Sequence, residues 1–320
     1  MSEEIIESVF SYSEKNSEPL MLTASKNQID WNGGYVNNWT TKEYMDFIKK
    51  LRGKYGQAKV YICRDHCGPG FKGKELDDTY RTIDADIENG FDLIHVDYCH
   101  YHGSKEEIIK ESKKAIEYIK SKKPETLIEI GTDENTGAFL DDVSIIEKEI
   151  NLFMESAKID FFVCQTGSLI KEINQIGDFN GVFLKKIREI ANKRNIFLKE
   201  HNADYLNVDE IQRRKNLIDA VNVAPQFGVI QTQLTIQKCL LYGIDFKDFI
   251  RDAYASEKWK KWLHDNRPEN KFLCSLIAGH YVFANKPYRE IYSTINRHEN
   301  FRETIMNEMI KNFDLYINNL

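Results

Sequence analysis

Two histidines and a glutamate fall at or near the ends of short apolar runs that are typical of buried strands. His66 and His201 each follow such a run, and Glu129 lies within a third run between them. Imidazole nitrogens and a carboxylate oxygen are ligands that a divalent metal accepts, and three of them leave an open position for substrate oxygens. We therefore predict a metal site formed by His66, Glu129 and His201. A hydrogen-bonded structural role for each histidine is the open alternative.

The runs that would position these residues form a regular series along the chain. They are nearly continuous in hydrophobicity, as expected for strands that are buried on both faces of a parallel sheet. Segments with helical periodicity lie between them, for example Thr41–Leu51, Lys105–Ile119 and Phe183–Arg194. The seven runs are Leu20–Thr23, Val60–Cys63, Leu93–Val96, Leu127–Ile130, Phe161–Cys164, Ile196–Lys199 and Ala220–Val223.

This alternation predicts an α/β fold, specifically a (β/α)8 TIM barrel. No Gly-x-Gly-x-x-Gly follows any of the runs, which argues against a dinucleotide-binding sheet. Only seven strands are clear, and Glu3–Lys15 has the pattern of a helix, so we expect the first strand to be irregular or missing. Residues 1–320 are expected to form one domain, with 247–320 as a C-terminal helical extension packed on it.

In a barrel of this kind the chemistry lies at the carboxyl ends of the strands and on the loops that follow them. Polar and glycine residues at these places are the candidates for binding substrate. We name ten such candidates: Asn27, Gln28, Arg64, Asp97, Gln165, Gly167, Ser168, Asn222, Gln226 and Gly228.

The composition and charge of the chain argue against several classes of protein. A formal net charge of −6 over 320 residues argues against a nucleic-acid partner or an anionic membrane surface, because both require a basic footprint. The acidic start of the chain does not resemble a secretory signal, and no apolar run approaches the length of a membrane span. Six scattered cysteines without a CxxC pair indicate reduced thiols. We expect a cytoplasmic protein.

Several of these motifs together resemble a known family. Leu22–Gln28 followed by Gly33-Gly34-Tyr35, Arg64-Asp65-His66-Cys67-Gly68-Pro69, and Glu200-His201-Asn202-Ala203-Asp204-Tyr205 are similar to segments of the tagatose-1,6-bisphosphate aldolase Z-type subunits. His95-Val96-Asp97, Ile130-Gly131-Thr132 and Gln165-Thr166-Gly167 follow in matching order, so the resemblance covers roughly residues 20–290. The Z-type chains are in turn similar to class II ketose-bisphosphate aldolases.

The resemblance implies a metal-dependent lyase of carbohydrate metabolism. Its cofactor would be a divalent metal, Zn²⁺ in the related enzymes, and its substrate a phosphorylated sugar formed from dihydroxyacetone phosphate and an aldehyde. Asp65 takes the place of the acid/base aspartate, and His66 and His201 take those of metal ligands. Asp133 or Glu134 matches the acidic loop that moves the proton at the donor carbon.

The chain also departs from the wider aldolase family. Gln165 stands where that family has a further metal histidine, and the glycine-rich phosphate loop after the last histidine is replaced by Asn202-Ala203-Asp204-Tyr205. Z-type chains share both changes and are often regarded as non-catalytic partners of a catalytic subunit. An accessory subunit is therefore the alternative function, with a homo-oligomer or a partner aldolase subunit as the expected assembly. An epimerase or isomerase that uses the same enediolate is a third reading.

If the chain is an aldolase, two further expectations concern its charged and glycine-rich segments. Arg64 would lower the pKa of the neighbouring Asp65. The substrate phosphate would bind to backbone N–H groups of Gly167-Ser168 and of residues 224–228, with a lysine or arginine from the C-terminal helices. Trp259, Trp262 and the aromatic segment 281–288 are expected to form core, a lid or a dimer contact.

Overall fold

A computed structural model describes residues 1–131, 143–264 and 268–320. Asp133 and Glu134 lie outside these described residues. The main sheet has seven parallel strands in the order β1-β2-β3-β4-β5-β8-β9, and a two-stranded antiparallel hairpin, β6–β7, follows β5. All seven predicted strands are confirmed. The strands are β1 Leu20–Ser25, β2 Val60–Cys67, β3 Leu93–Val96, β4 Leu127–Gly131, β5 Phe161–Cys164, β6 Ile170–Lys171, β7 Asn174–Gln175, β8 Phe197–Glu200 and β9 Ala220–Val221.

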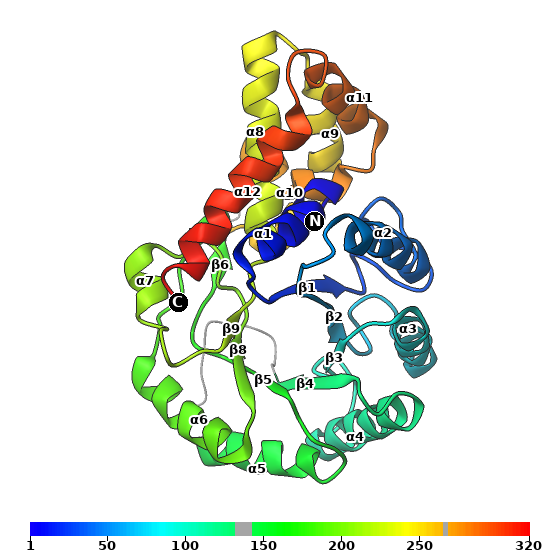
Figure 1. Cartoon of the computed structure of the whole chain (residues 1–320), viewed down its shortest axis with the longest axis vertical. Coiled ribbons are helices and arrows are strands. Elements are labelled where there is room, and N and C mark those ends of the chain that lie inside the picture. The colour runs from blue at the N-terminus through cyan, green and yellow to red at the C-terminus, as the bar shows by residue number, and fades with distance from the viewer. Residues whose placement is uncertain (132–142, 265–267) are drawn as a thin grey trace.

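The helices of the first two thirds of the chain lie around the curled sheet, with α2 to α6 along its outer side and α1 beside β1 and α12 (Figure 1). Their ends carry strong local signals: Thr40 and Glu43 form a capping box at the start of α2, and Ser104 and Glu107 form another at the start of α4. These helices are α1 Glu3–Asn16, α2 Thr41–Lys54, α3 Leu76–Asn89, α4 Lys105–Lys122, α5 Val143–Met154, α6 Gly181–Arg194 and α7 Val208–Gln212.

The sheet is not a closed eight-stranded barrel, which corrects the (β/α)8 prediction. No strand among the described residues pairs with both β9 and β1, and the sheet stays open at this seam. Helices flank it instead: α1 precedes β1, α8 follows β9, and the two contact each other where Ser2 Oγ donates to Gln231 Oε1 at 2.7 Å. The physical reason is local, because Ser2 caps α1 and Pro225 begins α8, so both segments favour helix.

The chain after β9 is helical. It comprises α8 Pro225–Tyr242, α9 Lys247–Ala255, η1 Lys258–Trp262, α10 Lys271–Ala278, η2 Gly279–Val282, α11 Lys286–Ile295 and α12 Phe301–Ile317. In Figure 1, α8, α9 and α11 project away from the sheet, and α12 returns across α1. Tyr12 Oη of α1 donates to Asp314 Oδ1 of α12 at 2.8 Å. The assignment of residues 247–320 to the same domain as the sheet stays a prediction.

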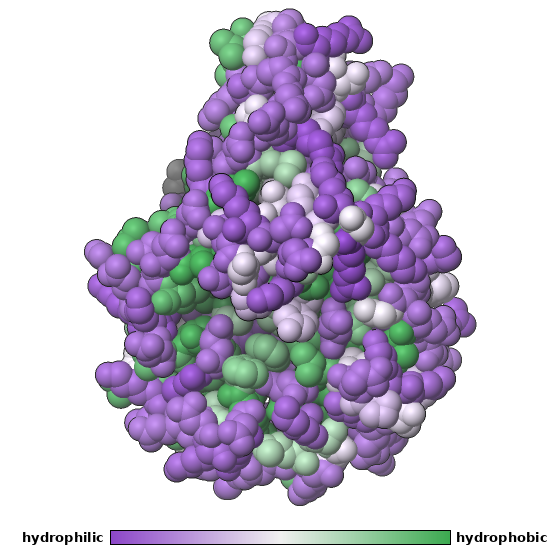
Figure 2. Space-filling model, viewed as in Figure 1, coloured by the Kyte–Doolittle hydropathy of each residue, from purple (hydrophilic) through white to green (hydrophobic). Residues whose placement is uncertain are grey.

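Two large apolar clusters support this arrangement. One joins α1, α2 and β1 to α8, α11 and α12, and the other packs α3 to α6 against the strands. Figure 2 shows that the surface is mostly hydrophilic, with apolar residues over the centre of the sheet in this view. None of the six cysteines forms a disulfide, and all but Cys99 are buried. No helix of the described chain is long and apolar enough to cross a membrane.

Candidate metal centre

Four side chains from four strands and the segments that follow them meet at one place. Asp65 comes from β2, His95 from β3 and Glu129 from β4, and His201 directly follows β8. Each offers one donor atom, and these atoms all lie within 4.8 Å of one another. His95 Nδ1 lies 3.5 Å from both Asp65 Oδ1 and Glu129 Oε1, and His201 Nε2 lies 3.8 Å from the same two oxygens. Parallel pairing explains the convergence, since His95 and Glu129 are direct partners across β3 and β4.

His66 lies at the edge of this group. Its ring centroid is 5.2 Å from those of both His95 and His201, so the structure brings His66 and His201 together. Asp97 Oδ2 is 2.6 Å from His66 Nδ1, and this contact orients the ring with Nε2 3.8 Å from Asp65 Oδ2. His66 has a φ of +46° at an irregularity in β2, a left-handed conformation that is rare for a residue other than glycine.

The donor atoms fit a divalent cation. Two ligands of one tetrahedral ion, each about 2.1 Å from it, lie about 3.4 Å apart, close to the separations seen here. His201 Nε2 and Asp65 Oδ1 are buried and have no hydrogen-bond partner in the described structure, since 3.8 Å is too long for a hydrogen bond. Two buried, unpartnered donor atoms facing each other are what a shared cation would satisfy.

The protonation states of the histidines and of Asp65 are compatible with metal binding. Burial lowers the pKa of His201, which keeps its imidazole neutral and able to ligate. Burial alone would raise the pKa of Asp65, but His66, His95, His201 and Lys199 outweigh it and hold that pKa well below its usual range. Burial opposes the charged form of His95, yet its carboxylate neighbours raise its pKa to about 9. A bound cation would compete with that proton.

Sequence reasoning did not identify Lys199, which lies in the same site. Its Nζ is 3.0 Å from both oxygens of Glu129, and both side chains are buried. Burial disfavours the ammonium, but Glu129 and Asp65 raise the pKa of Lys199, so it stays charged. The same pairing holds the pKa of Glu129 at about 2 against the effect of burial. Glu129 is thus shared between an ammonium and the cluster of donors.

We expect Lys199→Met to strengthen metal binding by about tenfold or more, because it removes a positive charge near the cation and frees Glu129. Without metal, this variant should unfold more easily than wild type, since Glu129 is left buried and unpaired. Calorimetric titration with Zn²⁺ or Mn²⁺, and melting with and without EDTA, test both effects. Lys199→Arg keeps the charge and serves as the control. Equal metal affinity in the methionine variant and wild type would contradict the expectation.

Arg64 is not brought to this site. Its guanidinium is fully buried and donates to Asp86 of α3 and to the carbonyl oxygens of Ala24 and Ile29. Side chains alternate along a strand, so Arg64 and Asp65 point to opposite faces of β2. The expectation that Arg64 lowers the pKa of Asp65 is wrong, because Arg64 pairs with Asp86, and the surrounding histidines and Lys199 are the groups that lower this pKa.

The expected phosphate cradle at residues 224–228 is already occupied. The backbone N–H groups of Ala224 and Gln226, at the start of α8, both donate to Asp204 Oδ1, at 3.0 and 2.8 Å. Gly228 lies within α8 and packs so closely against His280 that a Cβ there would come 2.6 Å from the Cβ of His280. These groups are therefore not free to hold an anion.

The Gly167-Ser168 segment is likewise engaged. Ser168 Oγ is buried, donates to Glu200 and accepts from Arg214 Nη2 at 3.0 Å, while Arg214 Nε donates to Glu200 Oε2 at 2.5 Å. Gly167 has a φ of +91°, which favours glycine at this turn. This network fixes the loop after β5 and leaves no free hydroxyl at Ser168.

The remaining candidates lie on loops at the same end of the sheet. Asn27 donates to the carbonyl oxygen of Phe71, and Gln28 Oε1 accepts from the backbone of Ser25 at 2.8 Å. Asn222 pairs with Glu200 through its backbone, and Gln165 is half-buried directly after β5. The contacts of Asn27, Gln28 and Asn222 hold their loops in place. A role in substrate binding stays a prediction for all four residues.

The stability of the protein is expected to depend on pH through Asp204. Burial raises its pKa to about 7 although two backbone N–H groups favour its charged form. An unfolded aspartate titrates at about 3.9, so the unfolded state loses its proton first and wild-type stability should fall as the pH rises from about 4 to about 7. Asp204→Asn keeps the accepting oxygen but cannot ionise. We expect the variant to gain about 2 kcal/mol or more relative to wild type between pH 4 and pH 8.

Urea unfolding at pH 4, 6 and 8, with EDTA present so that metal does not contribute, measures this difference. Parallel pH profiles for the two proteins would show that burial does not raise the pKa of Asp204.

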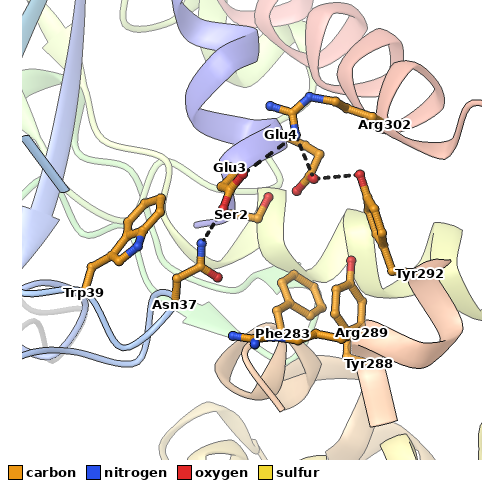
Figure 3. Close-up of a pocket in the computed structure, with 10 residues that line it drawn as sticks. All are labelled: Ser2, Glu3, Glu4, Asn37, Trp39, Phe283, Tyr288, Arg289, Tyr292 and Arg302. Atoms are coloured by element: carbon orange, nitrogen blue, oxygen red, sulfur yellow. Dashed lines mark hydrogen bonds and ion pairs between the residues drawn. The ribbon is translucent and has the colours of Figure 1, made fainter. Parts of the chain in front are cut away.

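A separate cavity of about 420 Å³ lies between the start of α1, the loop after β1, and helices α11 and α12 (Figure 3). Arg302 Nη1 is 3.3 Å from Glu4 Oε1, which also accepts from Tyr292 Oη at 2.8 Å, and Asn37 Nδ2 donates to Glu3 Oε1 at 2.9 Å. None of the residues that line it belongs to the metal-ligand cluster. These contacts tie α1 to the C-terminal helices.

Comparison with known proteins adds evidence on the fold. No protein-family model matches the chain. It resembles the crystal structure of a probable tagatose 6 phosphate kinase from Sinorhizobium meliloti 1021, with a TM-score of 0.77 at 14% identity over 97% of this chain and 89% of that one. It also resembles fructose-bisphosphate aldolase from Campylobacter jejuni, with a TM-score of 0.61 at 14% identity over 100% and 87%. A fructuronate-tagaturonate epimerase from Cohnella laeviribosi gives 0.65 at 14% over 98% and 80%. These likenesses show that the chain has an α/β, TIM-like fold.

Proposed function

We propose that this chain is a metal-dependent lyase of the class II ketose-bisphosphate aldolase type. It would make or break the C–C bond between dihydroxyacetone phosphate and an aldehyde, giving a ketose such as tagatose 1,6-bisphosphate. The observation that carries the proposal is the convergence of Asp65, His95, Glu129 and His201 at the carboxyl ends of parallel strands. The resemblance of the surrounding motifs to Z-type subunits supports the fold and the metal site more than it supports catalysis.

Each residue of the site has a proposed task. His201, His95 and Glu129 would hold the cation together with His66 or Asp65, and a bound divalent cation supplies Lewis-acid stabilisation of a developing enediolate. Zn²⁺ is the proposed ion. Asp97 orients His66 through its contact with Nδ1. Lys199 balances the charge of Glu129.

Asp65 is the proposed acid/base group. Its low pKa makes it a carboxylate at neutral pH, able to accept the proton of the substrate C4 hydroxyl during cleavage and to return it during condensation. The neighbouring histidines and Lys199 outweigh the effect of burial and keep this carboxylate ionised. Asp133 or Glu134 is proposed to move the proton at the donor carbon.

One experiment tests the proposal. The purified chain is analysed for bound metal and then incubated alone with dihydroxyacetone phosphate and a panel of aldehydes, with and without EDTA. We expect a ketose phosphate product that disappears with EDTA. Metal binding without any product from the lone chain would reject the lyase proposal.

The accessory-subunit alternative is favoured by one specific observation. Asp204 already fills the backbone N–H groups of Ala224 and Gln226, where a substrate phosphate was expected. An accessory chain would give no product alone but would raise the activity or stability of a class II aldolase chain added to it. The same assay, repeated with a catalytic aldolase chain present, separates the two functions.

A further inference from the structure

A cluster of aromatic and basic residues lies beside the open seam of the sheet. Trp262 of η1 donates from Nε1 to Tyr281 Oη of η2 at 3.2 Å, and Tyr281 packs against Tyr35 of the loop after β1, with ring centroids 4.8 Å apart. His280 contacts both tyrosine rings and lies against Gly228 of α8. The cluster therefore joins the loop after β1 to the helix after β9, on either side of the missing strand.

Lys261 brings an unpaired positive charge to this cluster. Its Nζ lies 4.4 Å from the ring centroid of Trp262, and it has no carboxylate partner among the described residues. The adjacent Lys260, in contrast, pairs with Glu257 at 2.7 Å. Desolvation by the surrounding protein lowers the pKa of Lys261. The residue is nevertheless exposed, so a ligand can reach it.

Two more polar groups belong to the same cluster of side chains. His280 is only 4% exposed, and its Nδ1 has no hydrogen-bond partner in the described structure. Burial lowers the pKa of His280 well below its usual range, with smaller contributions from the N-terminus of the chain and from Lys261, so the ring is neutral and can donate one N–H. Tyr281 Oη accepts from Trp262 and so keeps its own proton for donation. The ammonium of Lys261, Nδ1 of His280 and the hydroxyl of Tyr281 therefore have no anionic partner among the described residues.

The cluster lies at the end of the sheet that carries the metal ligands. Lys171 Nζ of the β6–β7 hairpin donates to the carbonyl oxygen of Lys261 at 3.0 Å, and the backbone of Glu172 donates to that of Trp262. From the same hairpin, Gln175 Nε2 donates to the carbonyl oxygen of Asn202 at 2.8 Å, directly after His201. One hairpin therefore contacts both η1 and the loop that presents His201.

We propose that Lys261, His280 and Tyr281 form an anion-binding subsite that holds the charged end of the substrate. Its assignment to the substrate rests on the proposed function. Phosphate and carboxylate share the required chemistry, because both accept hydrogen bonds from an ammonium and neutral donors. The subsite takes the place of the cradle at the start of α8, which Asp204 occupies. It also gives the C-terminal helices a task at the active site.

Binding of inorganic phosphate, dihydroxyacetone phosphate and glucuronate to the full chain is measured by calorimetric titration, with Lys261→Met and Lys260→Met as matched variants. We expect Lys261→Met to weaken binding of the preferred anion at least tenfold, while Lys260→Met binds as wild type does. Tyr281→Phe, which loses only the hydroxyl, should weaken binding by a smaller factor. Preference for the two phosphates or for glucuronate identifies the anion, and thermal melting confirms that the variants fold.

Two outcomes would overturn the subsite: no saturable binding of any of the three anions to wild type, or equal binding by wild type and Lys261→Met. Its failure is distinguishable from failure of the proposed function. If the lone chain forms a ketose phosphate and Lys261→Met leaves the KM for dihydroxyacetone phosphate unchanged, the subsite fails and the lyase stands. If no product forms but Lys261→Met alone loses anion binding, the subsite stands and the lyase fails.

Discussion

Replacing His201 by alanine is expected to lower metal affinity at least a hundredfold and to remove the metal-dependent part of any activity. His201 Nε2 is buried, unpartnered and 3.8 Å from two carboxylate oxygens, so it has no evident use except as a ligand. Loss of residues that merely support a ligand already costs about 10–100-fold in affinity, and a direct ligand should cost more. Metal content after dialysis and titration of the metal-free protein measure the effect.

His298→Ala is the matched control, because this histidine stacks on Tyr242 outside the cluster, with ring centroids 4.4 Å apart. It should leave metal content unchanged. A His201→Ala protein that folds and retains stoichiometric metal would show that the ion, if bound, is held elsewhere, for instance by His66, His95 and Asp97.

The strands and their order were accessible from sequence because each buried run is short, apolar and bounded by polar loops. His66 and His201 were accessible for the same reason, since a polar residue that ends a buried strand stands out. The open seam was only partly foreseen. The helix before β1 was predicted. Whether β9 and β1 come close enough to pair depends on how far the sheet curls, and the local sequence pattern does not encode this curvature.

His95 and Lys199 were missed as parts of the site although both lie in strands that were correctly predicted. A charged or polar side chain inside an otherwise apolar strand is costly to bury unless it meets a partner. Reading Leu93–Val96 and Phe197–Glu200 for such exceptions would have pointed to both residues. The alternation of side chains along β2 would likewise have shown that Arg64 and Asp65 point to opposite faces of the strand. The role of Asp204 could not be foreseen, because its contact joins the loop after β8 to the first turn of α8, and local sequence does not show that these segments meet.

Asp65→Asn is expected to lower kcat for aldol cleavage by about 10²–10⁴-fold at saturating metal, the usual range for loss of a general acid or base. The amide has nearly the same shape but cannot accept the substrate proton. Metal affinity should fall much less than in His201→Ala, because His95, Glu129 and His201 remain. Because the pKa of Asp65 lies well below its usual range, wild-type activity should not be lost through this group between pH 5 and pH 8.

The decisive comparison is between Asp65→Asn and Asp97→Asn, since Asp97 contacts His66 Nδ1 and the backbone N–H of Cys99 and is not the proposed proton acceptor. Both changes remove one buried carboxylate from the same site, so a loss of charge alone would affect them alike. If Asp65 moves the proton, kcat measured at saturating metal stays low in its variant, whereas the Asp97 variant recovers much of its activity as metal is added. Equal recovery of both variants would make Asp65 a metal ligand only, and the proton would then have to be moved by another group.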